Sequence, residues 1–237
     1  MPHLILVRHG QSEWNLKKKF TGWVDVDLTP KGKLEACKSG ELIKKQKIKF
    51  DYFYSSFQLR AINTLKFIKD TLRDKKEPIK AWQLNERHYG ELTGLDKDKM
   101  EEKLGKKKFF EFRRSWDKRP NPLNKNSPYH PLNIETYKEV PINKIPDTES
   151  LKDTYDRVLE FYKEEIKNKI VKNNILISAH GNSIRALCKY LFKLDNNQIS
   201  KLEIPTGNPL LINLDNNNKI ISCKYLDNER AKDLLVF

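Results

Sequence analysis

Two short apolar segments near opposite ends of the chain finish in nearly the same polar residues. The first reads LILVRHGQS at residues 4–12 and the second reads ILISAHGNS at residues 175–183. A short apolar run followed by a polar turn is typical of a strand buried on both faces of a parallel sheet. Ligands bind at the carboxyl edge of such sheets, so two neighbouring strands of this kind would bring His9 and His180 to one site.

The segments between the strands have helical periodicity, which indicates an α/β fold. Thr29 followed by Pro30 is typical of a helix start, because threonine caps the first turn and proline needs no amide donor there. This helix is predicted to run towards Lys47. Its predicted apolar face consists of Leu34, Cys37 and Leu42.

Further elements are predicted along the chain. Residues 50–55 are predicted as a strand, a helix follows from about residue 58, and Thr148 is predicted to cap a long helix. The apolar faces are predicted from residues at helical spacing, which are Ala61, Leu65, Ile68 and Leu72 in the first helix, Leu151, Tyr155, Val158, Tyr162 and Ile166 in the second, and Leu187, Leu191 and Leu194 in a helix after His180.

Residues 118–147 differ from the rest of the chain because they contain six of its eleven prolines. Tyr129, Ile134 and Tyr137 remain available for packing, so the segment is predicted to be an irregular insertion rather than a linker. Residues 1–237 are therefore predicted to form a single domain. The insertion is a candidate lid or interface near the ligand site.

Basic residues number 46 against 32 acidic ones, which gives a formal net charge of +14. This excess favours phosphorylated or polyanionic partners. The apolar run near the N-terminus is too short for a membrane span or a signal-peptide core. The three cysteines are too scattered for a disulfide framework or a zinc knuckle. We therefore expect a cytoplasmic protein that has no membrane partner.

The segment Arg8-His9-Gly10 combines groups that suit phosphoryl transfer. A neutral imidazole nitrogen can attack phosphorus, while an adjacent guanidinium lowers the imidazole pKa and binds the equatorial oxygens. Glycine lets a ligand approach the backbone closely. The alternative is a histidine held by a backbone carbonyl for structural reasons. The second His-Gly segment, at His180, favours the functional interpretation.

Other candidate sites have weaker support. His3, His88 and His130 do not have the spacing of metal ligands, so no metal site is predicted. Lysines at residues 17–19 and 106–108 form short runs of the kind that usually make a solvated face. No nucleic-acid-binding motif accompanies them. A basic nucleic-acid-binding module is nevertheless kept as the alternative from a different functional class, and we expect no nucleic-acid partner.

Longer motifs are distributed over essentially the whole chain. They read LVRHGQSEWN (6–15), FTGW (20–23), DVDLT (25–29), SS (55–56), RA (60–61), LNERHYG (84–90), RR (113–114), AHGNSIRA (179–186) and IPTG (204–207). In these stretches the chain resembles the cofactor-dependent phosphoglycerate mutases of the histidine phosphatase superfamily. Arg-His-Gly alone is typical of the superfamily, whereas NERHYG, the paired arginines and IPTG are typical of the mutase branch. The resemblance implies a three-layer α/β fold with a mostly parallel central sheet and helices on both faces.

The resemblance also implies a reaction and its residues. His9 would hold a phosphoryl group, donate it to one hydroxyl of a phosphoglycerate and take one back from the other, through 2,3-bisphosphoglycerate, which also acts as primer. No metal is implied. Glu86 would handle the hydroxyl proton, although without the motif it would be interpreted as a salt-bridge partner of Arg87. The other implied catalytic residues are His180, Arg8 and Arg60, and the implied substrate-binding residues are Asn15, Thr21, Gly22, Arg87, Tyr89, Lys97, Arg113, Arg114, Gly181 and Asn182.

An isomerase of glycolysis and gluconeogenesis that interconverts 3-phosphoglycerate and 2-phosphoglycerate is thus expected. Its partner would be a small phosphorylated acid, and its assembly a homo-oligomer, with a dimer favoured. Members of the family commonly close a C-terminal tail over the site, whereas this chain ends in DLLVF at residues 233–237. A shorter lid would admit water, which competes with the substrate hydroxyl for the phosphohistidine. A phosphatase of the same superfamily is therefore the nearest alternative.

Overall fold

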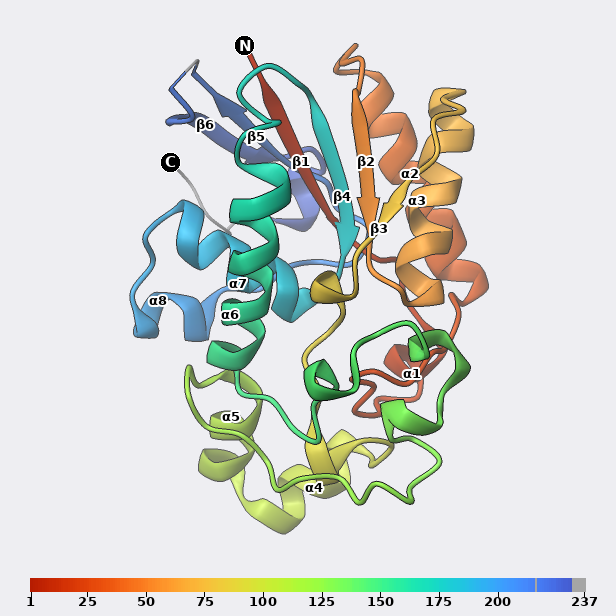
Figure 1. Cartoon of the computed structure of the whole chain (residues 1–237), viewed down its shortest axis with the longest axis vertical. Coiled ribbons are helices and arrows are strands. Elements are labelled where there is room, and N and C mark those ends of the chain that lie inside the picture. Colours follow the sequence, from red (N-terminus) through yellow and green to blue (C-terminus); the bar gives the residue numbers. More distant parts are fainter. Residues whose placement is uncertain (216, 232–237) are drawn as a thin grey trace.

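Six strands form one central sheet in the order β3-β2-β4-β1-β5-β6 (Figure 1). The computed structural model describes residues 1–215 and 217–231, so the predicted short lid at residues 233–237 lies outside the described residues. The strands are β1 (His3–Arg8), β2 (Tyr52–Ser55), β3 (Ile79–Lys80), β4 (Ile175–Ala179), β5 (Leu210–Leu214) and β6 (Ile220–Tyr225).

The sheet is mixed, with its parallel part around the two His-Gly strands. β1 pairs in parallel with β4, β4 with β2, and β2 with β3. β5 runs antiparallel to both of its neighbours, β1 and β6. The α/β prediction with a mostly parallel sheet is confirmed, while the antiparallel pair at one edge was not foreseen. Parallel pairing of β1 and β4 brings their carboxyl ends to the same edge, as the sequence predicted.

Helices cover both faces of the sheet. The helices of the described residues are α1 (Glu13–Leu16), α2 (Pro30–Lys44), α3 (Leu59–Leu72), α4 (Lys97–Leu104), α5 (Lys106–Arg114), α6 (Leu151–Phe161), α7 (Gly181–Leu191) and α8 (Asn196–Lys201). Of these, α1, α4 and α5 lie beyond the carboxyl ends of the parallel strands rather than on a face of the sheet (Figure 1). Shorter helical turns are Trp82–Leu84, Gly90–Leu92, Pro131–Asn133, Glu135–Tyr137, Ile142–Lys144, Asn228–Arg230 and a π-helical continuation of α6 at Tyr162–Ile166. None of the helices in the described ranges has both the length and the apolar content needed to cross a membrane.

Alternate residues of β1 enter two different apolar cores. Leu4 and Leu6 pack in the cluster that contains residues of α6 and α7, whereas Ile5 and Val7 pack in the cluster formed with α2 and α3. This alternation follows from the two-residue period of a strand. It produces the predicted three layers, with α2 and α3 on one face of the sheet and α6 and α7 on the other (Figure 1).

The predicted apolar face of α2 is wrong at Leu34, whereas Cys37 and Leu42 are half-buried. Thr29 caps the helix as predicted, accepting from the amide of Gly32, but Leu34 is 71% exposed. The buried positions are instead Gly32, Ala36, Ser39, Gly40 and Ile43. A Cβ atom at Gly32 would lie 2.0 Å from the carbonyl oxygen of Gln11, so the helix packs directly against backbone. Small residues therefore define its buried face, and hydrophobic periodicity could not reveal it.

The predicted cap of α6 is two residues early. Ser150 is the N-cap, and its hydroxyl accepts from the amide of Asp153, whose carboxylate accepts from the amide of Ser150. Thr148 instead donates its hydroxyl to the carbonyl oxygen of Pro120 at 2.8 Å. Both residues are suitable caps, but only Ser150 has an acidic residue three positions later to complete the capping box.

The proline-rich insertion packs beyond the carboxyl ends of the parallel strands (Figure 1). It contains three short helical turns, and Tyr137 is buried against Trp23. The Tyr137 hydroxyl donates to the carbonyl oxygen of Trp23 and accepts from the side-chain amide of Gln58. The aromatic residues of the insertion thus pack against the rest of the fold. It lies at the predicted edge of the sheet, and its function as a lid stays a prediction.

Candidate active site

The two predicted histidines meet at the carboxyl edge of the sheet. Arg8 at the end of β1 is in register with Ala179 at the end of β4, so the next residues are His9 and His180. The centroids of the two imidazole rings are 5.0 Å apart. The exposed fraction is 2% for His9 and 0% for His180. The close pairing predicted from the repeated motif is therefore present.

A single hydrogen bond determines which nitrogen of His9 is available for chemistry. Nδ1 lies 2.7 Å from the carbonyl oxygen of Gly10. A carbonyl oxygen can only accept, so Nδ1 carries the proton and Nε2 keeps its lone pair. Within the described ranges no hydrogen bond involves Nε2. Burial, with the charges of Arg60 and Arg8, holds the pKa of His9 well below its ordinary value, so the ring is neutral at neutral pH.

The side chain of His180 lies beside that of His9 and is held by a hydrogen bond to Ser56. Its Nε2 lies 2.8 Å from the hydroxyl oxygen of Ser56, the second serine of the predicted Ser-Ser motif. Burial and the charge of Arg60, followed by the neighbouring His9, hold the pKa of His180 well below its ordinary value. Two neutral imidazoles can lie this close without repelling each other, and either could be protonated only against the surrounding positive charge.

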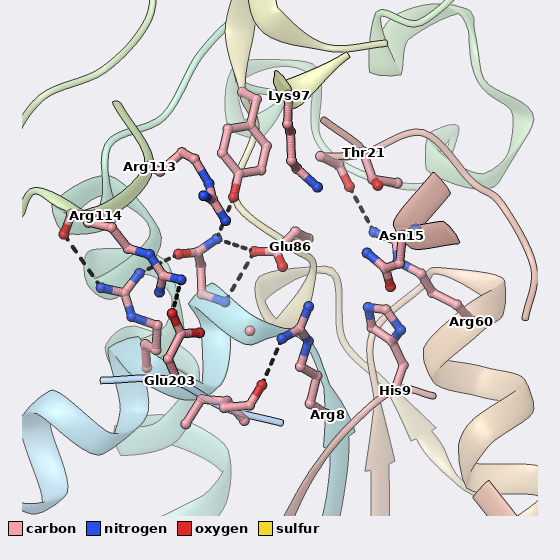
Figure 2. Close-up of a pocket in the computed structure, with 16 residues that line it drawn as sticks. Arg8, His9, Asn15, Thr21, Arg60, Glu86, Lys97, Arg113, Arg114 and Glu203 are labelled. Atoms are coloured by element: carbon pink, nitrogen blue, oxygen red, sulfur yellow. Dashed lines mark hydrogen bonds and ion pairs between the residues drawn. The ribbon is translucent and has the colours of Figure 1, made fainter. Parts of the chain in front are cut away.

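A cavity of about 120 Å³ opens in front of His9 (Figure 2). Its lining includes thirteen of the fifteen predicted site residues, all except His180 and Arg87. The lining consists of Arg8, His9, Asn15, Thr21, Gly22, Arg60, Glu86, Tyr89, Lys97, Arg113, Arg114, Gly181, Asn182, Arg185, Glu203 and Ile204. Six cationic side chains thus face two carboxylates. The size and the charge of this cavity suit a small polyanion rather than a polymer.

Backbone carbonyls fix the two arginines nearest His9. Arg8 donates from Nη1 to the carbonyl oxygen of Ile204 at 2.7 Å. Arg60 donates to the carbonyl oxygens of Val24 at 2.9 Å and Gly22 at 2.8 Å. Gly22 adopts a left-handed conformation with φ of 53°, which glycine tolerates without strain. Both guanidinium groups are therefore positioned before any ligand binds, which suits stabilisation of charge that develops during a reaction.

Two arginines that line the cavity have a buried donor with no partner among the described residues. Among the described residues that line the cavity, Nε of Arg8 and Nε of Arg185 are buried without a hydrogen bond. Unsatisfied buried donors are rare in folded proteins because each costs free energy. Acceptor oxygens of a bound anion would satisfy such groups. The donor set therefore fits a ligand with two anionic ends, including 2,3-bisphosphoglycerate.

Arg87 contributes to the site differently from the prediction. It is fully buried and does not line the cavity. Its Nη2 donates to the carbonyl oxygens of Phe112 at 2.8 Å and Arg113 at 3.1 Å. These carbonyls belong to the last turn of α5, which carries Arg113 and Arg114. The alternative interpretation of Glu86 as its salt-bridge partner is not supported, because the contact between them is the Arg87 amide donating to Oε1 of Glu86 at 2.7 Å.

Three residues of the lining were not predicted, namely Arg185, Glu203 and Ile204. Arg185 and Ile204 lie within motifs that the sequence singled out, so their proximity to the site could have been suspected. Glu203 forms an ion pair with Arg114 across the rim of the cavity. No periodicity or spacing in the sequence distinguishes it from other acidic residues.

His88 and His130 lie in loops beside each other, whereas His3 lies in β1 beside Asn213. His130 binds the carboxylate of Asp147 through Nε2 at 2.9 Å, and the rings of His88 and His130 are 6.2 Å apart. In residues 1–215 and 217–231, no group of three or more histidine, cysteine, aspartate or glutamate side chains could hold a metal ion.

Acidification is expected to destabilise the fold through His88. Burial, and then the neighbouring His130, lowers the pKa of His88 from 6.5 to about 3. Below pH 6.5 the unfolded chain binds a proton that the folded chain does not, so stability decreases as the pH falls from 6.5 towards 3. Between pH 7 and pH 5 this residue should remove about 2 kcal/mol of stability. Urea unfolding measures the effect, and His88→Gln should show a correspondingly flatter pH dependence. An identical pH dependence in the two proteins would contradict this assignment.

The proteins that this chain resembles in sequence belong to one superfamily. A sequence model of the histidine phosphatase superfamily (branch 1) matches residues 4–225. The chain is 75% identical to the 2,3-bisphosphoglycerate-dependent phosphoglycerate mutase of Pelagibacter ubique (strain HTCC1062), with both chains covered in full. It is 45% identical to phosphoglycerate mutase 1 of Saccharomyces cerevisiae, over 98% of this chain and 95% of that protein.

Solved structures of other proteins share the fold of this chain. A mycobacterial glucosyl-3-phosphoglycerate phosphatase matches with a TM-score of 0.68 and 21% identity, over 90% of this chain and 93% of that chain. A phosphoserine phosphatase of Entamoeba histolytica matches with a TM-score of 0.68 and 20% identity, over 97% and 99% of the two chains. The predicted resemblance is confirmed. The chain belongs to the histidine phosphatase superfamily and, within it, to the family of 2,3-bisphosphoglycerate-dependent phosphoglycerate mutases.

Proposed function

We propose that the chain is an isomerase that interconverts 3-phosphoglycerate and 2-phosphoglycerate in glycolysis and gluconeogenesis, with His9 as the residue that carries the phosphoryl group. The observation that carries the assignment of His9 is its hydrogen bond to Gly10, which leaves an unprotonated Nε2 at a cationic cavity. Attack of this nitrogen on phosphorus splits the isomerisation into two in-line transfers, so that no phosphoryl group has to migrate directly between neighbouring oxygens.

When bound, 2,3-bisphosphoglycerate supplies the phosphoryl group that primes His9. Arg8 and Arg60, fixed by backbone carbonyls, bind the equatorial oxygens of the group in transfer and stabilise its developing charge. Asn15 assists them. Its Oδ1 accepts from the amide of Ser12 at 3.1 Å, so its Nδ2 is available to donate to a ligand in the cavity. The ring of His180 packs beside that of His9, and its Nδ1, which has no hydrogen bond to a described residue, is the nitrogen that would donate to the same oxygens.

Basic residues at the opposite end of the cavity bind the second anionic end of the substrate. Arg113, Arg114 and Lys97 line this end, and Arg87 holds the turn that carries the two arginines. Bidentate pairing of guanidinium with carboxylate or phosphate fixes orientation as well as affinity. Thr21, Gly22, Tyr89, Gly181 and Asn182 complete the proposed binding set.

Glu86 handles the hydroxyl proton at each transfer. Its carboxylate is nearly buried, lines the cavity and forms no ion pair with a described residue. A carboxylate in this state can accept a proton as the hydroxyl attacks phosphohistidine and return it in the reverse step.

Incubation with 3-phosphoglycerate in EDTA tests the reaction. We expect formation of 2-phosphoglycerate that depends on added 2,3-bisphosphoglycerate and needs no divalent ion, because arginine side chains supply the positive charge. Release of inorganic phosphate faster than formation of the 2-isomer would favour the phosphatase alternative. Activity that is lost in EDTA and restored by a divalent ion would contradict a metal-free reaction.

Three further properties are part of the proposal. We infer a homodimer, which light scattering would test through the mass in solution. We infer a single cooperative domain over residues 1–237, for which thermal unfolding should show one transition. A cytoplasmic location agrees with three free cysteines, Cys37, Cys188 and Cys223, and cell fractionation would test it.

A further inference from the structure

We propose that Arg185 is a positioning residue that acts on Glu86 through the side-chain amide of Asn182. This inference rests on the proposed function of Glu86 as the group that handles the hydroxyl proton. It assigns a function to a buried arginine that the sequence did not single out, and it identifies which oxygen of Glu86 exchanges the proton.

Arg185 lies in α7 at the wall of the cavity and is only 2% exposed. It donates from Nη1 to Oδ1 of Asn182 at 2.8 Å, and from Nη2 to the carbonyl oxygen of Ile199. Among the described residues it has no ion pair with a carboxylate. A buried cation without a counter-ion is unfavourable for stability, so stability alone gives no reason for its presence.

The contact with Arg185 determines how the Asn182 amide is oriented. A guanidinium can only donate hydrogen bonds, so the oxygen of the amide must face Arg185. The amide nitrogen Nδ2 then faces Oε1 of Glu86 at 2.8 Å and the hydroxyl of Tyr89 at 3.0 Å. Rotation of the amide by half a turn would place its NH₂ group against the guanidinium and its oxygen against the carboxylate. Both contacts would be repulsive.

The oriented amide completes a set of three donors on one oxygen of Glu86. Oε1 accepts from the amide of Arg87 at 2.7 Å, from the amide of Asn182 at 3.2 Å and from Nδ2 of Asn182. In the described part of the chain, no hydrogen bond reaches the other oxygen, Oε2. In Figure 2 two dashed lines converge on one oxygen of the labelled Glu86, and these are the hydrogen bonds from the backbone amide and Nδ2 of Asn182.

This asymmetry divides the two carboxylate oxygens between different functions. Oε1 is saturated and anchors the side chain, so Oε2 is the oxygen that accepts and returns the proton. If the Asn182 amide could rotate, its oxygen would repel the carboxylate and Glu86 could turn away from the substrate hydroxyl. A misplaced base lowers the rate of proton transfer more than it lowers substrate affinity.

Steady-state kinetics at saturating 2,3-bisphosphoglycerate test the inference in two single variants. Arg185→Met removes the donor to Asn182. Asn182→Asp keeps the size of the side chain and its contact with Arg185 but replaces the NH₂ group that reaches Glu86. In both variants we expect kcat for 3-phosphoglycerate to fall about tenfold. KM should change by less than about threefold in Arg185→Met, whereas Asn182→Asp should also raise KM because it adds a negative charge at a proposed binding residue. Lys189→Met is the control, because Lys189 is also a basic residue of α7 that donates to a backbone carbonyl, that of Leu194, yet lies outside the cavity. Its kcat should not change.

A double-mutant cycle with Glu86→Gln shows whether Arg185 acts through Glu86. If it does, kcat of the Arg185→Met/Glu86→Gln double variant should be no lower than kcat of Glu86→Gln alone. Additive losses would overturn the proposal. The proposal would also be overturned if kcat were unchanged in both single variants, or if Arg185→Met changed only KM. Loss of cooperative unfolding in both single variants would overturn it as well. If instead Glu86→Gln has unchanged turnover, the proposed function of Glu86 fails first, and the two failures are thereby distinguished.

Discussion

Replacement of His9 by alanine is expected to abolish the phosphoenzyme and lower turnover by at least about 10⁴-fold, the loss typical of removing a nucleophile. His9 is neutral at neutral pH because burial and two arginines oppose its protonation, and its Nε2 faces the cavity. Brief exposure to labelled 2,3-bisphosphoglycerate followed by rapid denaturation measures the effect. Acid-labile label should be present on the wild-type chain and absent from the variant.

The neighbouring histidine makes this experiment informative. His180 is equally buried, lies 5.0 Å away between ring centroids and is also kept neutral. It differs because its Nε2 is engaged with Ser56. Label that persists on His180 in the His9→Ala protein would overturn the assignment of the nucleophile. His9→Gln serves as the matched control for the fold, since it fills more of the space than alanine. It should unfold at nearly the wild-type temperature and still carry no label.

Patterns that depend on neighbouring residues in the chain predicted most of the fold. The strands that precede His9 and His180 could be predicted because each is a short apolar run that ends in a turn, and their pairing follows from the parallel topology. Thr29 and Pro30 also predicted a helix start correctly, because capping depends only on residues that are neighbours in the chain. The face of α2 could not be predicted, because Gly32 is buried by contact with the backbone of Gln11 rather than by its own side chain.

The predicted site residues were chosen by residue type, whereas the contacts among them depend on tertiary structure. The sequence placed Arg87 among the substrate ligands, yet its guanidinium binds the carbonyls of Phe112 and Arg113. Arg185 occupied a quoted motif but was assigned no function. In both cases the direction of a long side chain determines what it contacts. That direction is set by packing around the loop that carries Arg87 and the helix α7 that carries Arg185, which spacing along one chain does not encode.

Glu86→Gln is expected to lower kcat by about 10²- to 10³-fold while KM for 3-phosphoglycerate changes little, as is typical when a group that transfers a proton is removed. The three donors on Oε1 of Glu86 require an acceptor at that position. Glutamine can satisfy them only with its carbonyl oxygen, which forces its NH₂ group into the position of Oε2. The variant therefore keeps the contacts of the side chain and replaces only the atom proposed to exchange the proton.

Steady-state rates in both directions at saturating 2,3-bisphosphoglycerate measure this effect. Glu91→Gln is the control, because the same substitution is made on an exposed residue whose carboxylate accepts from the side-chain amide of Asn121, outside the cavity. Turnover of Glu91→Gln should match that of the wild type. Unchanged turnover of Glu86→Gln would remove Glu86 from proton transfer. A rise in KM at constant kcat would instead make it a binding residue, because an interaction lost equally from the ground state and the transition state leaves kcat unchanged.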